Sequence, residues 1–342
     1  MVKATIIGHF GKNKTFLDGQ TVKTKVIYDY LVDKYGSKRI KKYDTYGSKR
    51  FLFKSPFVVL ISLIKSENVI ILPAHRGLKV LVPLINFFNK IFKRRIHYCV
   101  IGGWLPRITS KEKRIKNRLM RIDHIYVETL TMQKALNEQG FHNVIIMKNC
   151  KKLRINSLIS KNNTDSIVKL CTFSRVMRQK GIEDIVEALK VLNGDEVLYS
   201  LDIYGQIDNN EIDWFNNLKS NFPFYINYCG CVDYHLSVDT IKNYNLLVFP
   251  TKFYTEGIPG TIIDSFASGV PVLSSKWESF DDIIIDGVTG IGYEFDNVED
   301  LIIKLKFIYN NINLLENMSM NCIKEAEQYL PNNALKVLDD NL

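Results

Sequence analysis

Residues 249–272 read FPTKFYTEGIPGTIIDSFASGVPV. The apolar residues up to Pro250 predict the end of a buried strand, and the glycine-rich stretch after them predicts a loop. A short helix is expected to begin near Thr261, and Gly-Val-Pro then leads into the next strand. Strand, loop and helix in this order are typical of a parallel sheet wrapped by helices.

The loop in this stretch has the composition of an anion-binding site. Gly257 and Gly260 allow the backbone to approach a ligand closely, whereas Pro259 fixes φ and withholds one amide hydrogen. The helix that begins near Thr261 presents unpaired N–H groups at its start. These residues therefore predict a site for phosphate or a similar anion.

Two acids, Glu256 and Asp264, stand eight positions apart around this loop. We expect Asp264 in the first turn of the helix, where an acid stabilises the helix dipole. This purely structural interpretation explains Asp264 alone. The combination of Glu256 with the glycines favours a functional site.

A second stretch, residues 172–184, reads TFSRVMRQKGIED. A strand is expected to end at Phe173, and three cations precede an amphipathic helix: Arg175, Arg178 and Lys180. Cations at a helix N-terminus oppose the helix dipole. A multiply charged anion such as a diphosphate explains their position, and a solvated basic loop is the alternative.

Two further strands end at glycines, in LDIYGQ (201–206) and in YCGCVD (228–233). Gly205 and Val232 lie in these segments, where a flat base or a ribose can rest against the backbone. The six cysteines form no Cys-x-x-Cys pair, so neither a disulfide framework nor structural zinc is expected. We expect no bound metal and no cofactor.

Together these stretches resemble the family 4 glycosyltransferases, retaining enzymes with the GT-B fold, of the kind that builds bacterial surface polysaccharides. The resemblance rests on Arg175 with Lys180-Gly181, on the Glu256-Gly-Ile-Pro-Gly loop, and on the Gly-Val-Pro-Val after the second acid. Its strongest part covers residues 168–296. It implies an α/β chain of two Rossmann-like domains with a central cleft.

By this resemblance Arg175 and Lys180 hold the diphosphate of a nucleotide sugar, and Glu256 is the catalytic residue that contacts the donor sugar. The second acid binds the ribose hydroxyls, and here it is Asp264, one methylene shorter than the family's Glu. The other donor-binding residues are expected to be Gly205, Val232, Gly257, Ile258, Pro259, Gly260 and Thr261.

The first half of the chain resembles the acceptor-binding half of this family more loosely. Strand-like Thr5–Gly8, followed by a helix that opens at a glycine, is similar to the family's first strand and helix. The pair Gly8-x-x-Gly11 departs from the dinucleotide fingerprint, which disfavours a dehydrogenase. The acceptor or cleft residues are expected to be Gly19, Gln20, His75 and Gly103.

The chain has 342 residues, 46% hydrophobic and 24% charged, which describes a soluble globular protein and excludes a disordered or fibrous one. This length favours two domains. Strand and helix patterns alternate on both sides of a polar linker at 148–164. We predict an acceptor-binding domain over 1–155, a donor-binding domain over 165–325, and a helix or tail over 326–342 that packs back on the first domain.

Charge is divided unequally along the chain. Residues 1–160 hold 32 Lys and Arg against 9 Asp and Glu, a net charge of +23, whereas 161–342 hold 14 against 27, a net charge of −13. Cations beside apolar residues, as at 84–95, suit the surface of an anionic membrane. A merely solvated basic face is the alternative. No nucleic-acid module is recognised, so nucleic acid is not an expected partner.

The expected location is the cytoplasm, peripherally on the inner face of the cell membrane. No apolar run reaches the length of a membrane span, and the N-terminal residues lack the layout of a signal peptide. The expected function is transfer of a sugar from a nucleotide diphosphate sugar, with UDP favoured, to a lipid-linked or glycan acceptor. The alternatives are a sugar-nucleotide epimerase or hydrolase of the same fold, and a non-enzymatic membrane or nucleic-acid binder.

Overall fold

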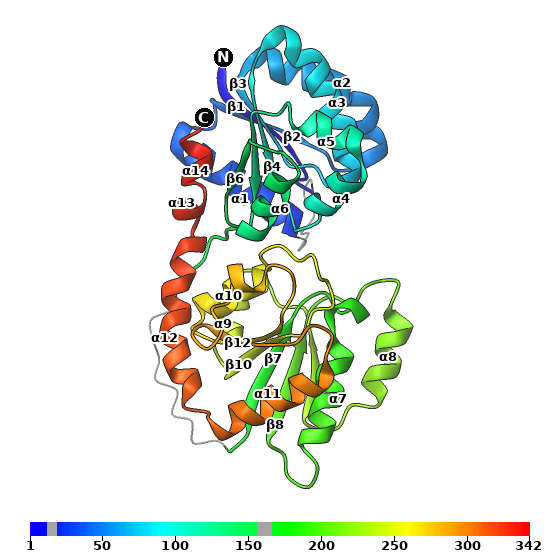
Figure 1. Ribbon diagram of the computed structural model, residues 1–342, viewed down its shortest axis with the longest axis vertical. Helices are drawn as coiled ribbons and strands as arrows, with labels where there is room; N and C mark the ends of the chain where they lie inside the picture. Colours follow the sequence, from blue (N-terminus) through cyan, green and yellow to red (C-terminus); the bar gives the residue numbers. More distant parts are fainter. Residues whose placement is uncertain (12–18, 156–165) are drawn as a thin grey trace. The chain divides into compact units, whose positions relative to one another are not determined.

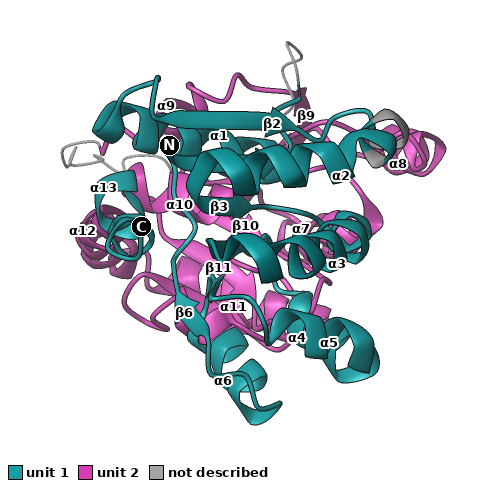
Figure 2. Ribbon diagram, turned by 90° about the horizontal axis from the view of Figure 1, so that it is seen from above, with its two compact units in different colours: residues 1–152, 329–342 teal, residues 153–328 magenta. Residues whose placement is uncertain are grey.

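A computed structural model describes residues 1–11, 19–155 and 166–342, without the side chains at 48–50 and 52. The chain forms two compact units (Figure 2). Unit 1 comprises residues 1–152 and 329–342, and unit 2 comprises residues 153–328. Each unit is built around one six-stranded sheet in which every neighbouring pair of strands is parallel.

The sheet of unit 1 has the strand order β2-β1-β3-β4-β5-β6. Its strands are β1 (Val2–Gly8), β2 (Ile40–Asp44), β3 (Ser66–Ile71), β4 (Arg95–Cys99), β5 (His124–Val127) and β6 (Val144–Ile146). The chain moves outward from β1 in both directions, so the ends of β1 and β3 mark the point where the strand order reverses. Ligand sites of open parallel sheets form beyond the carboxyl ends of strands at such a point.

Helices cover both faces of this sheet (Figure 1). They are α1 (Gly19–Tyr35), α2 (Ser48–Lys65), α3 (His75–Phe92), α4 (Leu105–Lys111), α5 (Lys113–Leu119) and α6 (Leu130–Glu138). Alternate residues of β1 point to opposite faces. Ile7 packs in the same apolar cluster as α2 and α3, whereas Ile6 packs in the cluster that contains α1.

The last residues of the chain pack in unit 1, on the α1 side of the sheet. They form α13 (Pro331–Ala334) and α14 (Lys336–Asp339). Leu335, between the two helices, and Leu338 of α14 are buried in the cluster that contains α1. The Tyr35 hydroxyl donates a hydrogen bond to Asp339 Oδ1 at 2.6 Å, and Lys34 forms an ion pair with the same carboxylate. Residues 329–342 thereby complete the core that residues 1–152 begin.

The sheet of unit 2 has the order β12-β11-β10-β7-β8-β9. Its strands are β7 (Val168–Phe173), β8 (Tyr199–Tyr204), β9 (Ile226–Gly230), β10 (Leu246–Phe249), β11 (Val272–Ser275) and β12 (Gly290–Tyr293). Its helices are α7 (Ile182–Leu192), α8 (Ile212–Ser220), α9 (Ser237–Ile241), α10 (Gly260–Ala267), α11 (Val298–Asn310) and α12 (Leu314–Ala326). Helix α7 lies beside α11, and α10 lies between α9 and α12.

The prediction of two parallel α/β sheets with flanking helices is confirmed. Neither the strands β2 and β12 nor the helices α2, α4, α5, α9 and α12 were expected from the sequence. Strand β2 is an edge strand with one buried residue, and β12 contains two glycines among four residues, so neither forms an apolar run. Helix α3 contains Pro83 near its middle. None of the helices in the described ranges combines the length and the apolar character needed to cross a bilayer.

His97 on β4 is a buried polar residue in the core of unit 1. Its ring nitrogens are hydrogen-bonded to Tyr126 Oη and Asn68 Oδ1, each at 3.1 Å. Burial lowers the pKa of His97 from 6.5 to about 3, and the nearby His124 and Arg95 add to the effect. The imidazole of His97 therefore stays uncharged in the folded unit at pH values near 6.5, where a histidine in the unfolded chain takes up a proton.

The stability of unit 1 is predicted to fall as the pH drops below 6.5, because the unfolded chain binds a proton at His97 that the folded chain does not. The loss from this residue approaches about 1.4 kcal/mol per pH unit. Native-state hydrogen exchange at the β4 amides measures it. His97→Gln is expected to flatten the acid side of the profile, whereas His142→Gln, at an exposed position, is the control. Equal slopes in wild type and His97→Gln would contradict the assignment.

Candidate functional site

The residues selected in the second half of the chain lie at the carboxyl ends of β7 and β10. These strands are neighbours in the sheet, with Leu246 opposite Leu170 and Leu247 opposite Cys171. The loops that follow them therefore begin side by side. The loop after β7 contains a 3-10 turn over Arg178–Lys180, and the loop after β10 leads into α10.

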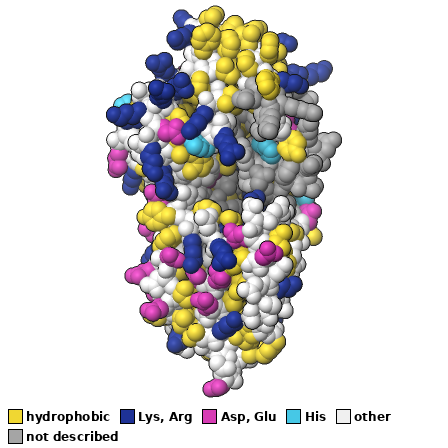
Figure 3. Space-filling model, turned by 90° about the vertical axis from the view of Figure 1, so that its right-hand side faces the viewer, with side chains coloured by type: hydrophobic (Ala, Val, Ile, Leu, Met, Phe, Trp, Pro, Cys, Tyr) yellow, Lys and Arg dark blue, Asp and Glu magenta, His cyan; other side chains and the backbone are white. Residues whose placement is uncertain are grey.

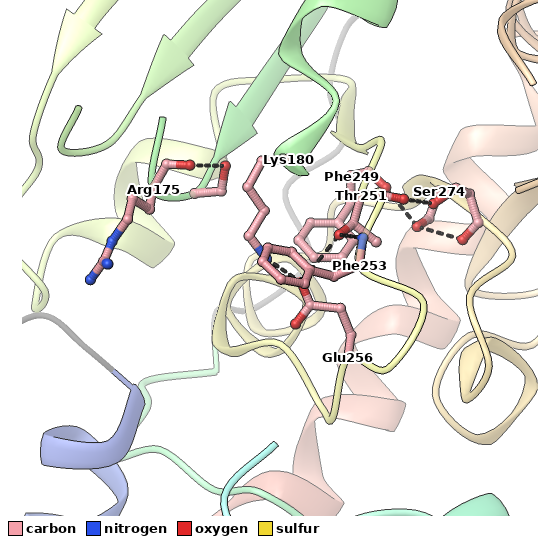
Figure 4. A network of polar contacts seen from close by, with 9 residues as sticks. Arg175, Lys180, Phe249, Thr251, Phe253, Glu256 and Ser274 are labelled. Atoms are coloured by element: carbon pink, nitrogen blue, oxygen red, sulfur yellow. Dashed lines mark hydrogen bonds and ion pairs between the residues drawn. The ribbon is translucent and has the colours of Figure 1, made fainter. Parts of the chain in front are cut away.

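An ion pair joins the two loops: Lys180 Nζ contacts Glu256 Oε1 (Figure 4). Both side chains are largely shielded from solvent, with 16% and 19% of their surfaces exposed. The Thr251 hydroxyl donates a hydrogen bond to the same carboxylate oxygen at 3.2 Å and accepts one from the Phe253 amide at 3.1 Å. Glu256 is thus held from two sides. The sequence analysis did not select Thr251, because a single threonine after a strand has no distinctive spacing.

Two aromatic rings surround the ammonium group of Lys180. The Nζ atom lies 5.4 Å from the centroid of the Phe249 ring and 4.9 Å from that of Phe253. Cation–π contacts of this length attract the ammonium group and restrict the side chain. Lys180 therefore presents a fixed positive charge at the end of β10.

Backbone contacts hold the loop after β10 in place. Ser274 Oγ donates to the carbonyl of Phe249 at 2.8 Å, and Ser275 Oγ donates to that of Thr251 at 2.6 Å. The Lys252 amide donates to the carbonyl of Gln179 at 2.8 Å, which ties the loop to the turn that carries Lys180. A charged pair held by fixed backbone loses little conformational entropy when a ligand binds.

Gly181 is the residue that allows the two loops to approach. Its φ is +69°, and a Cβ added there would lie 1.8 Å from the carbonyl oxygen of Pro250. Any side chain at this position must therefore push the Lys180 turn away from the end of β10. Gly194, in contrast, has open space where a Cβ would stand.

Gly181→Ala is predicted to destabilise unit 2 by at least about 2 kcal/mol, from a strained φ and a backbone clash together. Gly194→Ala is the matched control and is expected to change stability by less than about 0.5 kcal/mol. Urea unfolding of both variants, compared with wild type, provides the measurement. Equal midpoints for the two variants would mean that the close approach to Pro250 is not a real constraint.

The three cations of the loop after β7 do not converge on one point. Arg175 is exposed, extends away from Lys180 in Figure 4, and lies 3.6 Å from Asp208. The guanidinium of Arg178 lies 5.1 Å from the Trp214 ring centroid and 3.8 Å from Glu183. The expectation of three cations around one anion is therefore wrong for Arg178, whose charge has partners on α7 and α8.

Helix α10 begins at Gly260, with Pro259 as its N-cap and no side-chain cap. The expectation that Asp264 lies in the first turn is therefore wrong, because it is the fifth residue of the helix; its side chain is buried. Thr261 is in the first turn, and its hydroxyl oxygen is shielded from solvent without a hydrogen-bond partner among the described residues. Before α10, Gly257 and Ile258 are buried and Pro259 is partly exposed.

Gly205 and Val232 lie beyond the ends of β8 and β9. Gly205 has φ +137°, and a Cβ there would meet the Ser174 carbonyl oxygen at 1.7 Å, so packing against the loop after β7 accounts for this glycine. Val232 is half-buried. Cys229 and Cys231 are exposed free thiols. Among the described residues, no group of three or more His, Cys, Asp or Glu is arranged to hold a metal ion.

The residues selected in the first half follow the carboxyl ends of β1, β3 and β4 in unit 1. Gly19 opens α1, and Gln20 Nε2 donates to the carbonyl of Leu72 at 3.0 Å. His75 opens α3, with its Nε2 3.4 Å from Glu112 Oε1 and its ring 5.8 Å from that of Trp104. Gly103 is buried in the turn between β4 and α4. These residues share one edge of the sheet of unit 1, whereas the donor candidates belong to unit 2.

Comparison with known proteins gives a match to the family model described as glycosyl transferases group 1, over residues 157–328. The chain is 25% identical over 154 residues to an uncharacterised glycosyltransferase of Methanocaldococcus jannaschii, a match that covers 42% of this chain and 37% of that protein. It is 26% identical over 157 residues to the capsular polysaccharide biosynthesis glycosyltransferase CapM of Staphylococcus aureus, covering 45% and 40%. The chain thus matches about two fifths of the length of these relatives.

Solved structures match over nearly the whole chain. The Anabaena protein HepE in complex with UDP has a TM-score of 0.77 at 12% identity, covering 99% of both chains. Sucrose-phosphate synthase from Thermosynechococcus elongatus has a TM-score of 0.79 at 13% identity, covering 100% of this chain and 98% of that one. At these identities the similarity shows the fold, which is GT-B as predicted.

Proposed function

The chain belongs to the group 1 glycosyl transferases, and on this basis we propose that it transfers a sugar from a nucleoside diphosphate sugar to an acceptor. UDP is the proposed carrier, because HepE was solved with UDP. The proposed acceptor is a lipid-linked or free glycan in surface polysaccharide assembly, by analogy with CapM. We propose retention of the anomeric configuration, as in the family that the sequence resembles, and a location on the cytoplasmic face of the membrane.

The observation that carries the proposal is the Lys180–Glu256 ion pair beside the start of α10. Lys180 offers a fixed cation, and the first turn of α10 offers N–H groups that have no partner within the helix. A diphosphate that contacts both would replace Glu256 as the partner of Lys180. Glu256 would then be free to accept hydrogen bonds from hydroxyls of the donor sugar.

In the proposed reaction the bond between the anomeric carbon and the β-phosphate oxygen breaks, and its electrons stay on the leaving diphosphate. The acceptor hydroxyl forms the new bond to the anomeric carbon, and its proton passes to an oxygen of the leaving diphosphate. Lys180, Arg175 and the start of α10 would stabilise the charge that develops on the diphosphate. We propose that these groups suffice without a metal ion. Asp264, Gly205 and Val232 remain our candidates for contacts to the nucleoside.

Lys180→Ala is predicted to lower kcat/KM for the donor by about 100-fold, because a charge-assisted contact to the leaving group is removed. Arg175→Ala is expected to cost about tenfold, since this side chain is exposed and less constrained. Lys190→Ala, which removes an exposed cation from α7, is the control. Transfer and donor hydrolysis, assayed with a panel of nucleotide sugars, provide the measurement.

Unchanged rates in Lys180→Ala, Arg175→Ala and Glu256→Ala would exclude the proposed site. Product analysis without acceptor separates the alternatives. A transferase leaves the donor sugar largely intact under these conditions, whereas a hydrolase releases free sugar and an epimerase releases an isomeric sugar nucleotide.

Thr251→Val is predicted to lower kcat about tenfold with UDP affinity unchanged, because it frees Glu256 from one of its two anchors without altering the phosphate contacts. Thr251→Ser keeps the hydroxyl and is expected to restore most of the rate. Steady-state kinetics measure the change in kcat, and calorimetric titration with UDP measures the change in UDP affinity. A parallel loss of UDP affinity would show that Thr251 supports the whole loop instead of positioning Glu256.

A further inference from the structure

Two helices of unit 1, α2 and α3, direct large apolar side chains into solvent. On α2, Phe53 is 83% exposed and Phe57 69% exposed, and Ile61 and Ile64 are also exposed. On α3, Phe87 is 66% exposed and Ile91 75% exposed. We call the face formed by these six residues the α2–α3 surface.

The spacing of these residues places them in continuous stripes. Phe53, Phe57, Ile61 and Ile64 follow one another at intervals of four, four and three, which is one face of a helix. Phe87 and Ile91 are likewise one turn apart on α3. Other residues of the same helices, such as Val59 and Ile85, are buried in the core, so the exposed stripes are additional to the core-facing ones.

The two helices pack against each other, so their exposed stripes belong to one region of unit 1. Figure 3 shows hydrophobic side chains gathered at the end of unit 1 that carries α2 and α3, with Lys and Arg side chains on either side. A contiguous exposed apolar patch of this kind on a protein surface marks an interaction site more often than it arises by chance.

The charged side chains of α2 and α3 themselves are all cations. Acids stand beside the two helices: Glu67 follows α2, and Glu112, just before α5, forms an ion pair with Lys79 of α3 at 2.9 Å. Residues 48–65 and 75–95 contain no Asp or Glu. The exposed cations on and beside the two helices, among the described side chains, are Lys54, Lys65, Arg76, Lys79, Lys90, Lys93 and Arg95. Helix α5 lies against α3, where Asn86 Nδ2 donates to the carbonyl of Arg118 at 2.9 Å, and it adds the exposed cations Lys113, Arg114 and Arg118.

This combination of apolar stripes and cations fits one class of partner. Nucleic acid would pair with the cations but has no apolar layer for phenylalanines that protrude from helices. A second copy of this chain would bring the same cations face to face, at a cost in repulsion. An anionic bilayer offers both phosphates for the cations and an acyl boundary for the aromatic rings.

We propose that the α2–α3 surface docks unit 1 on an anionic lipid bilayer. The phenylalanines and isoleucines enter the boundary between headgroups and acyl chains, and the surrounding lysines and arginines lie among the lipid phosphates. The proposal deepens the proposed function, because docking would hold the enzyme at the surface where a lipid-linked acceptor resides. Only this biological purpose of docking rests on the proposed function.

The test is co-sedimentation of the full chain with vesicles of phosphatidylcholine that contain about one third phosphatidylglycerol, and with pure phosphatidylcholine vesicles. Phe53→Ser, Phe57→Ser and Phe87→Ser in one chain are expected to weaken binding to the anionic vesicles by at least about tenfold. The matched control combines Phe224→Ser, Ile303→Ser and Phe307→Ser, which are exposed apolar positions in unit 2. This control is expected to bind like wild type.

A variant with fewer cations tests the proposed contact between the lysines of the α2–α3 surface and the lipid phosphates. Lys54→Gln, Lys90→Gln and Lys93→Gln together are expected to weaken binding about tenfold at low salt and less as salt rises, because exposed charges are screened. Lys190→Gln, Lys306→Gln and Lys324→Gln, all exposed in unit 2, form the matched control.

Three outcomes would overturn the proposal. One is wild-type binding that is absent, or equal on neutral and anionic vesicles. Another is binding to anionic vesicles that stays at the wild-type level in both the triple serine variant and the triple glutamine variant of the α2–α3 surface. The third is an apolar variant whose main effect is to convert a dimer into a monomer in analytical ultracentrifugation, which would assign the surface to a second copy. Titration of every variant with UDP reports separately on the donor site, so failure of docking and failure of the proposed function are distinguishable.

Discussion

The contact between Lys180 and Glu256 is the interaction around which the candidate site of unit 2 is organised. It joins the loops after β7 and β10, two strands that are far apart in the sequence but are neighbours in the sheet. Two charges that are mostly shielded from water are costly unless each has partners. Lys180 has Glu256 and two aromatic rings, and Glu256 has Lys180 and the Thr251 hydroxyl. The two charges satisfy each other in the free protein, and the proposed function has a diphosphate take the place of Glu256 beside Lys180.

Several features of the fold converge on this pair. The carboxyl ends of the parallel strands bring the loops to one edge, and Gly181 lets the Lys180 turn reach the end of β10. Ser274 and Ser275 then fasten the loop after β10 to β11. The loops that carry Glu256 and Lys180 are therefore fixed by hydrogen bonds to their backbone carbonyls. Such preorganisation suits a site that must stabilise charge during a reaction.

Much of this arrangement was predictable from the sequence. The alternation of apolar runs with helical periodicity predicted two parallel sheets. The Arg…Lys-Gly and Glu-Gly-Ile-Pro-Gly stretches were assigned to one candidate site, and their loops lie in contact in the structure. The contact of Lys180 with Glu256, 76 positions apart, follows once both loops are placed at one edge. Thr251 was missed because its role depends on a hydrogen bond and has no sequence pattern. Arg178 was assigned to the anion site with Arg175 and Lys180, because its contact with the Trp214 ring can be recognised only once α8 is placed.

Other features depend on burial, which local sequence describes poorly. Asp264 was expected in the first turn of α10, but the helix begins at Gly260 with Pro259 as its N-cap, so Asp264 is its fifth residue. The segment at 48–65 was not singled out from the sequence, because its exposed aromatic stripe is recognisable only when α2 is known to bury a different face. The neutral His97 in the core of unit 1 likewise follows from its position on a central strand, since a histidine in sequence has no such signature.

A crystal structure of the protein with UDP tests the central claim most directly. The account predicts diphosphate oxygens within hydrogen-bond distance of Lys180 Nζ and of the first N–H groups of α10, with the contact between Lys180 and Glu256 opened. A nucleotide bound elsewhere, or one bound nearby while the ion pair stays intact and the phosphates touch neither group, would contradict it.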